Sequence, residues 1–428
     1  MRYEVGRIFA FMVFIINPML WSSYGIFEAI TTNKRFSYFK IAVFFGVLGF
    51  SLFPWGDGYE RFLVYEKAKI MTFAEFVIYG FSQGDVVFYI FSYILSINDV
   101  PYQFMQFISV FCGYLILLLL ARRFFSPLLR SERYFLIMVL FFLVHFVSLA
   151  NGIRYLLSTI ILLYAIINFE CDGRKSKFMT LFLLSIMTHF YAAIVFVIYF
   201  FSKRMALLYS KKTIHLIVFC LFICSSISWV LFEYIAVIFS NGDGFMERKI
   251  ASYMLRGDLL ITKMVSSPAQ AVHYFFYQMP LLIFILYFVC YGDKNCIKTK
   301  TFLCFFALCL PFAYFFSIYL RLTYFCMLYG FLLLIQNWRL CRPRGYWLLI
   351  LILFSFCFMV VELAFFKRHL EKDNISYVNE GSLCSIAMPP ILLYKCAYTI
   401  DEIHMGNREF RMMKAESREN TMESFSGE

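Results

Sequence analysis

Residues 174–204 read RKSKFMTLFLLSIMTHFYAAIVFVIYFFSKR, an apolar stretch with basic residues at both ends and His189 near its centre. A single membrane span here would place the basic segments 170–177 and 203–212 on opposite sides of the bilayer, whereas basic loops collect on the cytoplasmic side. Splitting the stretch at His189 gives two half-helices of about 11 residues, each ~16 Å long. Such a pair enters from the cytoplasm, turns near mid-membrane and returns. We therefore expect a re-entrant helix pair, with one full span as the alternative.

The composition of the whole chain requires a bilayer. Of the 428 residues, 62% are hydrophobic and only 15% are charged, and the mean hydropathy is +0.73. A soluble domain carries about 25% charged residues, so this chain has too little polar surface to cover a water-soluble globule. This excludes a cytosolic enzyme, a nucleic-acid-binding module and a disordered scaffold. It leaves an all-α, polytopic integral membrane protein.

The net charge of +12 is explained by topology and indicates no nucleic acid partner. The positive-inside rule assigns six basic loops to the cytoplasm; they lie at 34–40, 121–133, 170–177, 203–212, 294–300 and 339–344. A helix needs ~20 apolar residues to cross a membrane. About ten stretches qualify, at 8–30, 38–54, 101–121, 134–150, 153–169, 213–239, 270–291, 301–319, 321–337 and 346–366.

The segments between these spans fall on the outer side. They are the long amphipathic segment 55–100, turns near 150–153 and 319–321, the segment 240–269, and everything from 367 onwards. We expect a membrane domain over 1–366 that includes 55–100, an outer or interfacial segment over 367–400 with a short apolar patch at 385–400, and a disordered polar tail over 401–428.

Two arginines depart from the charge pattern. Arg154 follows Asn151-Gly152-Ile153 just inside the outer end of a predicted helix, and Arg321 has the matching place in SIYLRLTY, residues 317–324. Ionisable side chains within spans are costly and mark functional sites by default. Two guanidinium groups at one face suit a diphosphate or another polyanion. The alternative is a pair of arginines that extend to the membrane interface.

His189 and Asp57 are the candidates for proton transfer. Histidine titrates near neutral pH, which suits general acid–base chemistry; alternatively His189 stabilises the helix break. Asp57 stands in PWGDGYER, residues 54–61, where the flanking glycines leave its carboxylate accessible. It could act as a base, orient a hydroxyl group or cap the turn. His145, Glu233 and Glu362 are weaker candidates, and His145 fits a structural role better.

Several sequence motifs are absent. The chain contains no Walker A motif, no H-E-x-x-H, no G-x-S-x-G and no D-x-D pair. Its 13 cysteines include no Cys-x-x-Cys pair, which indicates neither a disulfide framework nor a zinc site. We expect no metal and no other cofactor. An enzyme of this kind would act on a substrate that is already activated, and the arginines suggest activation by a diphosphate.

Four spaced motifs make residues ~50–340 resemble the EpsG/Wzy-type polysaccharide polymerases of bacterial envelopes. They are Gly56-Asp57-Gly58-Tyr59, Asn151-Gly152-Ile153-Arg154, Thr188-His189-Phe190-Tyr191 and Arg321-Leu322-Thr323-Tyr324. All four fall on, or open towards, the outer face in the topology derived from Lys and Arg alone. One departure is Tyr155, where the family commonly has a polar residue such as Gln after the arginine.

The resemblance implies a multi-pass glycosyltransferase of the bacterial inner membrane, with 1–366 as its catalytic domain. Its substrate would be undecaprenyl-diphosphate-linked oligosaccharide, polymerised at the periplasmic face into O-antigen or a similar surface polysaccharide. A chain-length regulator is a candidate partner. His189 and Asp57 would be catalytic, Arg154 and Arg321 would bind the diphosphate, and Tyr59, Arg61 and Tyr324 would contact substrate. Two guanidinium groups would supply the charge that a metal provides elsewhere.

Three other functions fit part of the sequence. Membrane arginines and a broken helix also occur in transporters, so a flippase for lipid-linked sugars is an alternative, although we find no internal repeat. An O-antigen ligase shares the polymerase chemistry. A polysaccharide acyltransferase would have its histidine in a different sequence setting.

Overall fold

The computed structural model describes most of the chain. The described residues are 12–13, 17–54, 57–126, 128–223, 268–293, 296–313, 316–338, 344–371 and 397–408. Every regular element among them is a helix, which confirms the all-α class. Some features singled out in the sequence lie outside the described residues: Trp55, Gly56, Glu233, most of 240–269, most of 385–400, and the tail from 409.

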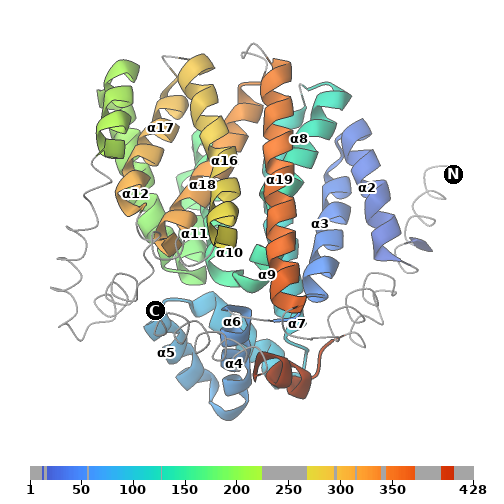
Figure 1. The fold of residues 1–428 in the computed structure, drawn as a ribbon. Coiled ribbons are helices and arrows are strands. Elements are labelled where there is room, and N and C mark those ends of the chain that lie inside the picture. Colours follow the sequence, from blue (N-terminus) through green and yellow to red (C-terminus); the bar gives the residue numbers. More distant parts are fainter. Residues whose placement is uncertain are drawn as a thin grey trace, which may run out of the picture.

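The helices form a bundle and, below it in Figure 1, a smaller outer layer. The bundle contains α2 (Pro18–Thr32), α3 (Arg35–Phe50), α7 (Gln103–Phe125), α8 (Arg130–Leu143), α9 (Phe146–Asn151), α10 (Ile153–Asp172), α11 (Lys175–Thr188), α12 (Tyr191–Leu208), α16 (Pro268–Tyr291), α17 (Ile297–Cys309), η2 (Leu310–Phe312), α18 (Phe316–Gln336) and α19 (Arg344–Glu371). The outer layer contains α4 (Asp57–Lys67), η1 (Ala68–Ile70), α5 (Phe73–Gln83) and α6 (Val86–Ile97).

Four helices of the described chain are long and apolar enough to cross a membrane. They are α7, α10, α12 and the part of α18 from Ile318 to Gln336. Shorter apolar helices are Val86–Ile97, Phe275–Tyr291 and Leu349–Val361. The predicted spans 101–121, 153–169 and 321–337 coincide with α7, α10 and α18.

The predicted span 134–150 is interrupted. The chain leaves α8 at Val144 and His145, which have extended backbone angles, and α9 follows as a helix of 6 residues. Such a break frees backbone groups that need new partners. The hydroxyl of Tyr114 on α7 donates to the Val144 carbonyl and meets this need.

The predicted turn at 319–321 is wrong. Pro311 lies just after the end of α17 and has no N–H with which to continue the helical ladder. The chain therefore turns earlier, and α18 begins at Phe316 and runs without a break through 319–321. Arg321 consequently lies in the second turn of α18.

The basic loops lie together at one end of the bundle, the upper end in Figure 1. Side-chain contacts join neighbouring loops. Arg122 Nε donates to Asn33 O (3.0 Å), Arg123 pairs with Asp172, and Trp338 donates to Glu132 (2.8 Å). Glu170 lies 3.5 Å from Lys203 and 3.8 Å from Lys298, and Lys300 donates to Tyr209 O (3.1 Å). These contacts connect five of the six loops. Trp338 lies just before the sixth loop and attaches its start to the same end, while residues 339–343 of that loop lie outside the described chain. We call this the basic end.

A break at His189 separates α11 from α12. His189 has extended backbone angles, and α12 begins at Tyr191. The two helices fold back on each other, because Phe182 and Phe196 have ring centroids 4.4 Å apart, and Lys203 near the end of α12 returns to the basic end. The helices have 14 and 18 residues, so both are longer than predicted. The break and the common end match the expectation from Lys and Arg.

The outer layer has its own hydrophobic core. Its buried members include Phe62, Phe76 and Tyr89, together with Ile403 from a helix over residues 400–408. The prediction of a disordered tail from 401 is therefore wrong for 401–408. Thr399 and Glu402 exchange hydrogen bonds in the manner of a helix-capping box, which starts this helix.

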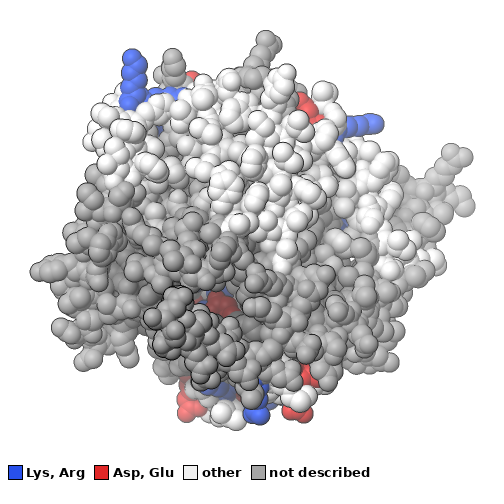
Figure 2. Space-filling model, viewed as in Figure 1, with Lys and Arg blue, Asp and Glu red and all other residues white. Residues whose placement is uncertain are grey.

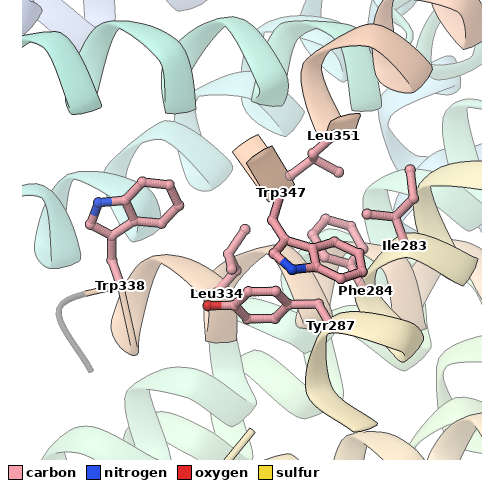
Figure 3. Close-up of a pocket in the computed structure, with 7 residues that line it drawn as sticks. All are labelled: Ile283, Phe284, Tyr287, Leu334, Trp338, Trp347 and Leu351. Carbon is pink, nitrogen blue, oxygen red and sulfur yellow. The ribbon is translucent and has the colours of Figure 1, made fainter. Parts of the chain in front are cut away.

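Charged side chains on the face shown in Figure 2 lie mainly at the two ends of the molecule, with one small charged spot near the centre. Aromatic residues gather near the basic end. In Figure 3, Trp338, Trp347 and Tyr287 line a small pocket between α16, α18 and α19. Such a distribution is typical of the interfacial aromatic belt of membrane proteins.

Candidate functional site

Asp85 connects two of the predicted site residues. It lies between α5 and α6, and its side chain is fully buried. One carboxylate oxygen contacts the Arg154 guanidinium, and the other lies 2.5 Å from His189 Nδ1. Arg154 and His189, which stand 35 positions apart in the chain, thus meet at a single carboxylate of the outer layer.

A left-handed turn places Asp85. Gly84 has φ +72°, a region that glycine occupies at no steric cost. Its carbonyl accepts from Phe190 N at 3.1 Å, and a Cβ at Gly84 would lie 3.2 Å from the Phe190 side chain. The α5–α6 connection and the tip of the α11–α12 hairpin are therefore in direct backbone contact, which fixes Asp85 against His189.

The hairpin itself is attached to α10. Ser185, one turn before the break, donates from its hydroxyl to the Ser158 carbonyl at 2.7 Å, and both residues are fully buried. Because α10 also carries Arg154, this hydrogen bond fixes the position of His189 along the bundle axis relative to Arg154.

The hydrogen bond to Asp85 defines the roles of the two His189 nitrogens. An ionised carboxylate only accepts, so Nδ1 carries the proton and donates. In the neutral ring, Nε2 is then a proton acceptor. A carboxylate that orients a histidine in this way is the arrangement that enzymes use to prepare a general base.

Asp85 is ionised at neutral pH. Burial by itself raises the pKa of its carboxyl group, but the hydrogen bond from His189 and the positive charges of Arg154 and Arg61 lower it more. The net result is a pKa below the usual value for an aspartic acid. The site therefore holds one buried negative charge among several positive ones.

Arg321 completes the cluster from α18. Its guanidinium lies over two aromatic rings, 4.8 Å from the centroid of Tyr155 and 5.9 Å from that of Tyr191. The charges of Arg154 and Arg321 both act on the His189 ring. Tyr155, which departs from the family pattern, thus provides a surface on which the second arginine stacks.

The motif that contains Asp57 and Gly58 also lies against the motif that contains Asn151. A Cβ at Gly58 would be 2.5 Å from Asn151 Oδ1, and the Gly58 carbonyl accepts from the Tyr102 hydroxyl at 3.0 Å. Asp57 is in the first turn of α4 and is exposed. The four motifs noted in the sequence therefore converge where the bundle meets the outer layer.

The comparison with protein families agrees with this convergence. A family model described as the EpsG family matches residues 34–379, most of the chain. The chain belongs to the EpsG family. EpsG is a Wzy-type polysaccharide polymerase family. No curated protein and no solved structure matches the chain.

Three further predicted residues of this EpsG-family protein have distinct surroundings. The Tyr59 hydroxyl lies 2.9 Å from His404 Nδ1, so this side chain faces the helix over 400–408. Arg61 Nε is buried and has no hydrogen-bond partner among the described residues. Tyr324 is buried on α18, one turn after Arg321. Of the three, Arg61 is linked to the cluster through its charge on Asp85.

His145 packs in the core of the bundle. Its ring lies edge-on to Phe358, with centroids 4.1 Å apart, and the residue is 5% exposed. This agrees with the structural role favoured from the sequence. The side chain of Glu362 lies outside the described residues. The described part of the chain contains no group of three or more His, Cys, Asp or Glu that could hold a metal ion.

Asp85 belongs to none of the four motifs and was not among the predicted site residues. The signal was present, because Asp85 is the only charged residue between Glu75 and Asp99 and it follows a glycine that separates two apolar runs. A lone carboxylate in such a setting is costly to bury unless a partner is supplied elsewhere in the fold. The partners, Arg154 and His189, come from distant parts of the EpsG-family chain.

Proposed function

We propose that the protein polymerises undecaprenyl-diphosphate-linked oligosaccharide repeat units at the periplasmic face of the bacterial inner membrane. Membership of a polysaccharide polymerase family supports the general role. The observation that carries the specific proposal is the contact of His189 and Arg154 with Asp85, with Arg321 stacked nearby. The cluster lies at the end of α10 opposite the basic end, which the positive-inside rule assigns to the cytoplasm.

In the proposed reaction, an acceptor sugar hydroxyl attacks the anomeric carbon of the lipid-linked glycan. His189 Nε2 takes the hydroxyl proton, and Asp85 stabilises the imidazolium that forms. The bond between the anomeric carbon and the diphosphate oxygen breaks, and lipid diphosphate leaves with the bonding electrons. Asp57, exposed at the start of α4, is the second candidate for the base.

Arg154 and Arg321 would stabilise the leaving diphosphate. Positive charge held in advance where negative charge develops lowers the barrier, because it requires no reorganisation during reaction. Arg154 is held by Asp85 and Arg321 by its two tyrosines, so both are preorganised. We propose that these two groups act without a metal ion, and that Arg61 and Tyr324 contribute to binding the substrate.

The same proposal includes the membrane topology. About ten spans cross the bilayer, and the α11–α12 hairpin is re-entrant, with its tip at His189 and both outer ends in the cytoplasm. Non-helical backbone inside the hydrocarbon region of a membrane is tolerated only where protein surrounds it or where it lines a water-filled cavity. The burial of His189 and its contact with the outer layer are consistent with this requirement.

The test is the glycan pattern of a deletion strain. Loss of a polymerase leaves a single repeat unit on the lipid A core, whereas loss of a ligase leaves long chains on the lipid carrier and loss of a flippase gives neither. Complementation with the wild-type gene should restore the ladder. Complementation with His189→Gln, Arg154→Ala or Arg321→Ala should not, with the protein still present in the membrane. Full-length ladders from the arginine variants would contradict the diphosphate assignment.

A further inference from the structure

A cavity of about 380 Å³ adjoins the site. It lies between α6, α7, α10 and α11, and its wall is almost entirely aliphatic and aromatic. Leu157 and Ile161 line it from α10, Cys112 and Ile116 from α7, and Leu184 from α11. The one charged residue in its wall is Arg154.

The cavity is elongated along the bundle. Its lining on α10 extends from Arg154 to Tyr164, about 15 Å at 1.5 Å per residue. Along α7 it extends from Met105 to Leu119, about 21 Å. Since α10 runs from the site towards the basic end, the cavity starts at the Asp85 cluster and continues into the depth of the membrane. Phe91 and Leu184 at its rim are 42% and 40% exposed, which leaves the groove open to the side.

We propose that this groove holds the polyisoprenyl chain of the lipid-linked substrate, with the diphosphate at Arg154. The inference rests on the proposed function and specifies where its substrate lies. An apolar groove within the membrane excludes water and is filled by a hydrocarbon chain. The guanidinium at one end selects a chain that carries an anionic head group at that same end.

The groove also explains how the substrate is aligned. When the isoprenyl chain lies between α7 and α10, its diphosphate head group lies beside Arg154. Arg154 and His189 both contact Asp85, so the head group is also close to the histidine. Burial of the isoprenyl chain supplies binding energy that grows with the number of buried CH₂ groups and is independent of the sugar. Donor glycans of any length are then held through the same lipid contact.

The test measures binding of isoprenyl diphosphates without sugar to the purified full-length protein, using short, medium and long chains. Affinity should rise with chain length until the groove is full. Leu184→Trp and Cys112→Trp occupy the groove and should weaken binding of the long chain by at least about tenfold. Both variants should leave binding of the short chain unchanged. Two positions are used so that a folding defect in one variant does not decide the result.

Val197→Trp is the matched control. Val197 lies on α12, outside the groove, and is 50% exposed, so this variant should behave as wild type. Equal affinity for short and long chains, or wild-type binding by both groove variants, would overturn the proposal. Displacement of the long chain by equimolar phosphatidylglycerol would also overturn it, because the groove would then be an ordinary lipid site.

The experiments distinguish an error in the groove assignment from an error in the proposed polymerase function. If both groove variants bind long chains as wild type does while the gene still restores polymer, the groove assignment is wrong and the function stands. If chain-length-dependent binding is found but the deletion strain lacks the single-repeat phenotype, the polymerase assignment is wrong and the groove stands.

Discussion

At the scale of single residues, Asp85 has two tasks. It compensates the charge of Arg154, and it fixes the proton on His189 Nδ1. The first task concerns stability and the second concerns chemistry, so substitutions can separate them.

Asp85→Asn should lower stability and abolish the glycan ladder. Removing one partner of a buried ion pair costs about 3–5 kcal/mol because the other charge stays buried. The double variant Asp85→Asn/Arg154→Gln should recover part of that stability but no polymer. Thermal unfolding of the purified protein and the glycan ladder are the two measurements. Asp99→Asn is the control, since its side chain is 83% exposed. A full-length ladder from Asp85→Asn would eliminate the proposed role.

Gly84→Ala and Gly173→Ala form a matched pair. Both glycines have positive φ, +72° and +67°, so each alanine should cost about 1–2 kcal/mol in backbone strain. Only at Gly84 does the new Cβ also meet Phe190, whereas nothing lies within 4 Å at Gly173. We expect similar losses in melting temperature but a loss of polymer only in Gly84→Ala. Equal polymer from both variants would argue against a role for this contact.

The stacking of Arg321 on Tyr155 makes Tyr155→Phe and Tyr155→Leu informative. Phenylalanine keeps an aromatic face for the guanidinium, and leucine does not. A cation–π contact contributes about 0.5–2 kcal/mol, so the leucine variant should polymerise roughly 2- to 30-fold more slowly. The phenylalanine variant should remain near wild type. Rates are compared by following ladder growth at equal protein levels, and equal rates for both variants would contradict a role for stacking.

At the scale of elements, the break at His189 between α11 and α12 was predictable from the sequence. Basic residues at both ends and His189 in the middle define it, and all of these are visible in the chain. The helix over 400–408 was predictable from Thr399-Ile400-Asp401-Glu402, a T-x-x-E pattern, but its contacts with the outer layer were not. The break between α8 and α9 depends on Tyr114, and the pairing of Asp85 depends on two distant helices. Tertiary contacts of this kind leave no local pattern.

The hairpin topology predicts which thiols are accessible in intact cells. In a background without native cysteines, Leu208→Cys at the end of α12 should resist a membrane-impermeant thiol reagent, although Leu208 is 76% exposed. Ile70→Cys in the outer layer, 85% exposed, should react and serves as the control. Both should react once the membrane is opened. Labelling of Leu208→Cys in intact cells would mean that residues 178–201 cross the membrane as a single span.

At the scale of the whole molecule, the bundle and the outer layer meet at the site. Among the described residues, the bundle has a large hydrophobic core and a small second cluster around Trp21, and the outer layer has its own core, which the helix over 400–408 completes. His404 pairs with Glu66 at 2.9 Å, and Asn407 donates to the Pro54 carbonyl at 3.1 Å. The helix over 400–408 is therefore attached to the last turn of α4 and to the segment that precedes α4.

Ile403→Ala should therefore destabilise the outer layer although it lies far along the chain from the motifs. Ile403 is 1% exposed, whereas Met405 on the same helix is 50% exposed. Truncation of a buried isoleucine costs about 2–5 kcal/mol, and Met405→Ala should be close to neutral. Thermal unfolding of the two purified variants provides the comparison. Equal melting temperatures would mean that this helix does not stabilise the protein.

Contact between the two layers at Gly84 and Phe190 has a consequence for biosynthesis. Asp85 emerges from the ribosome 104 residues before His189, so the α5–α6 connection is synthesised well before the hairpin tip that it contacts. Until then Asp85 and Arg154 can pair, but the histidine is absent. A chain that stops between Arg154 and His189 therefore holds Asp85 and its arginine partner but lacks the histidine that Asp85 orients.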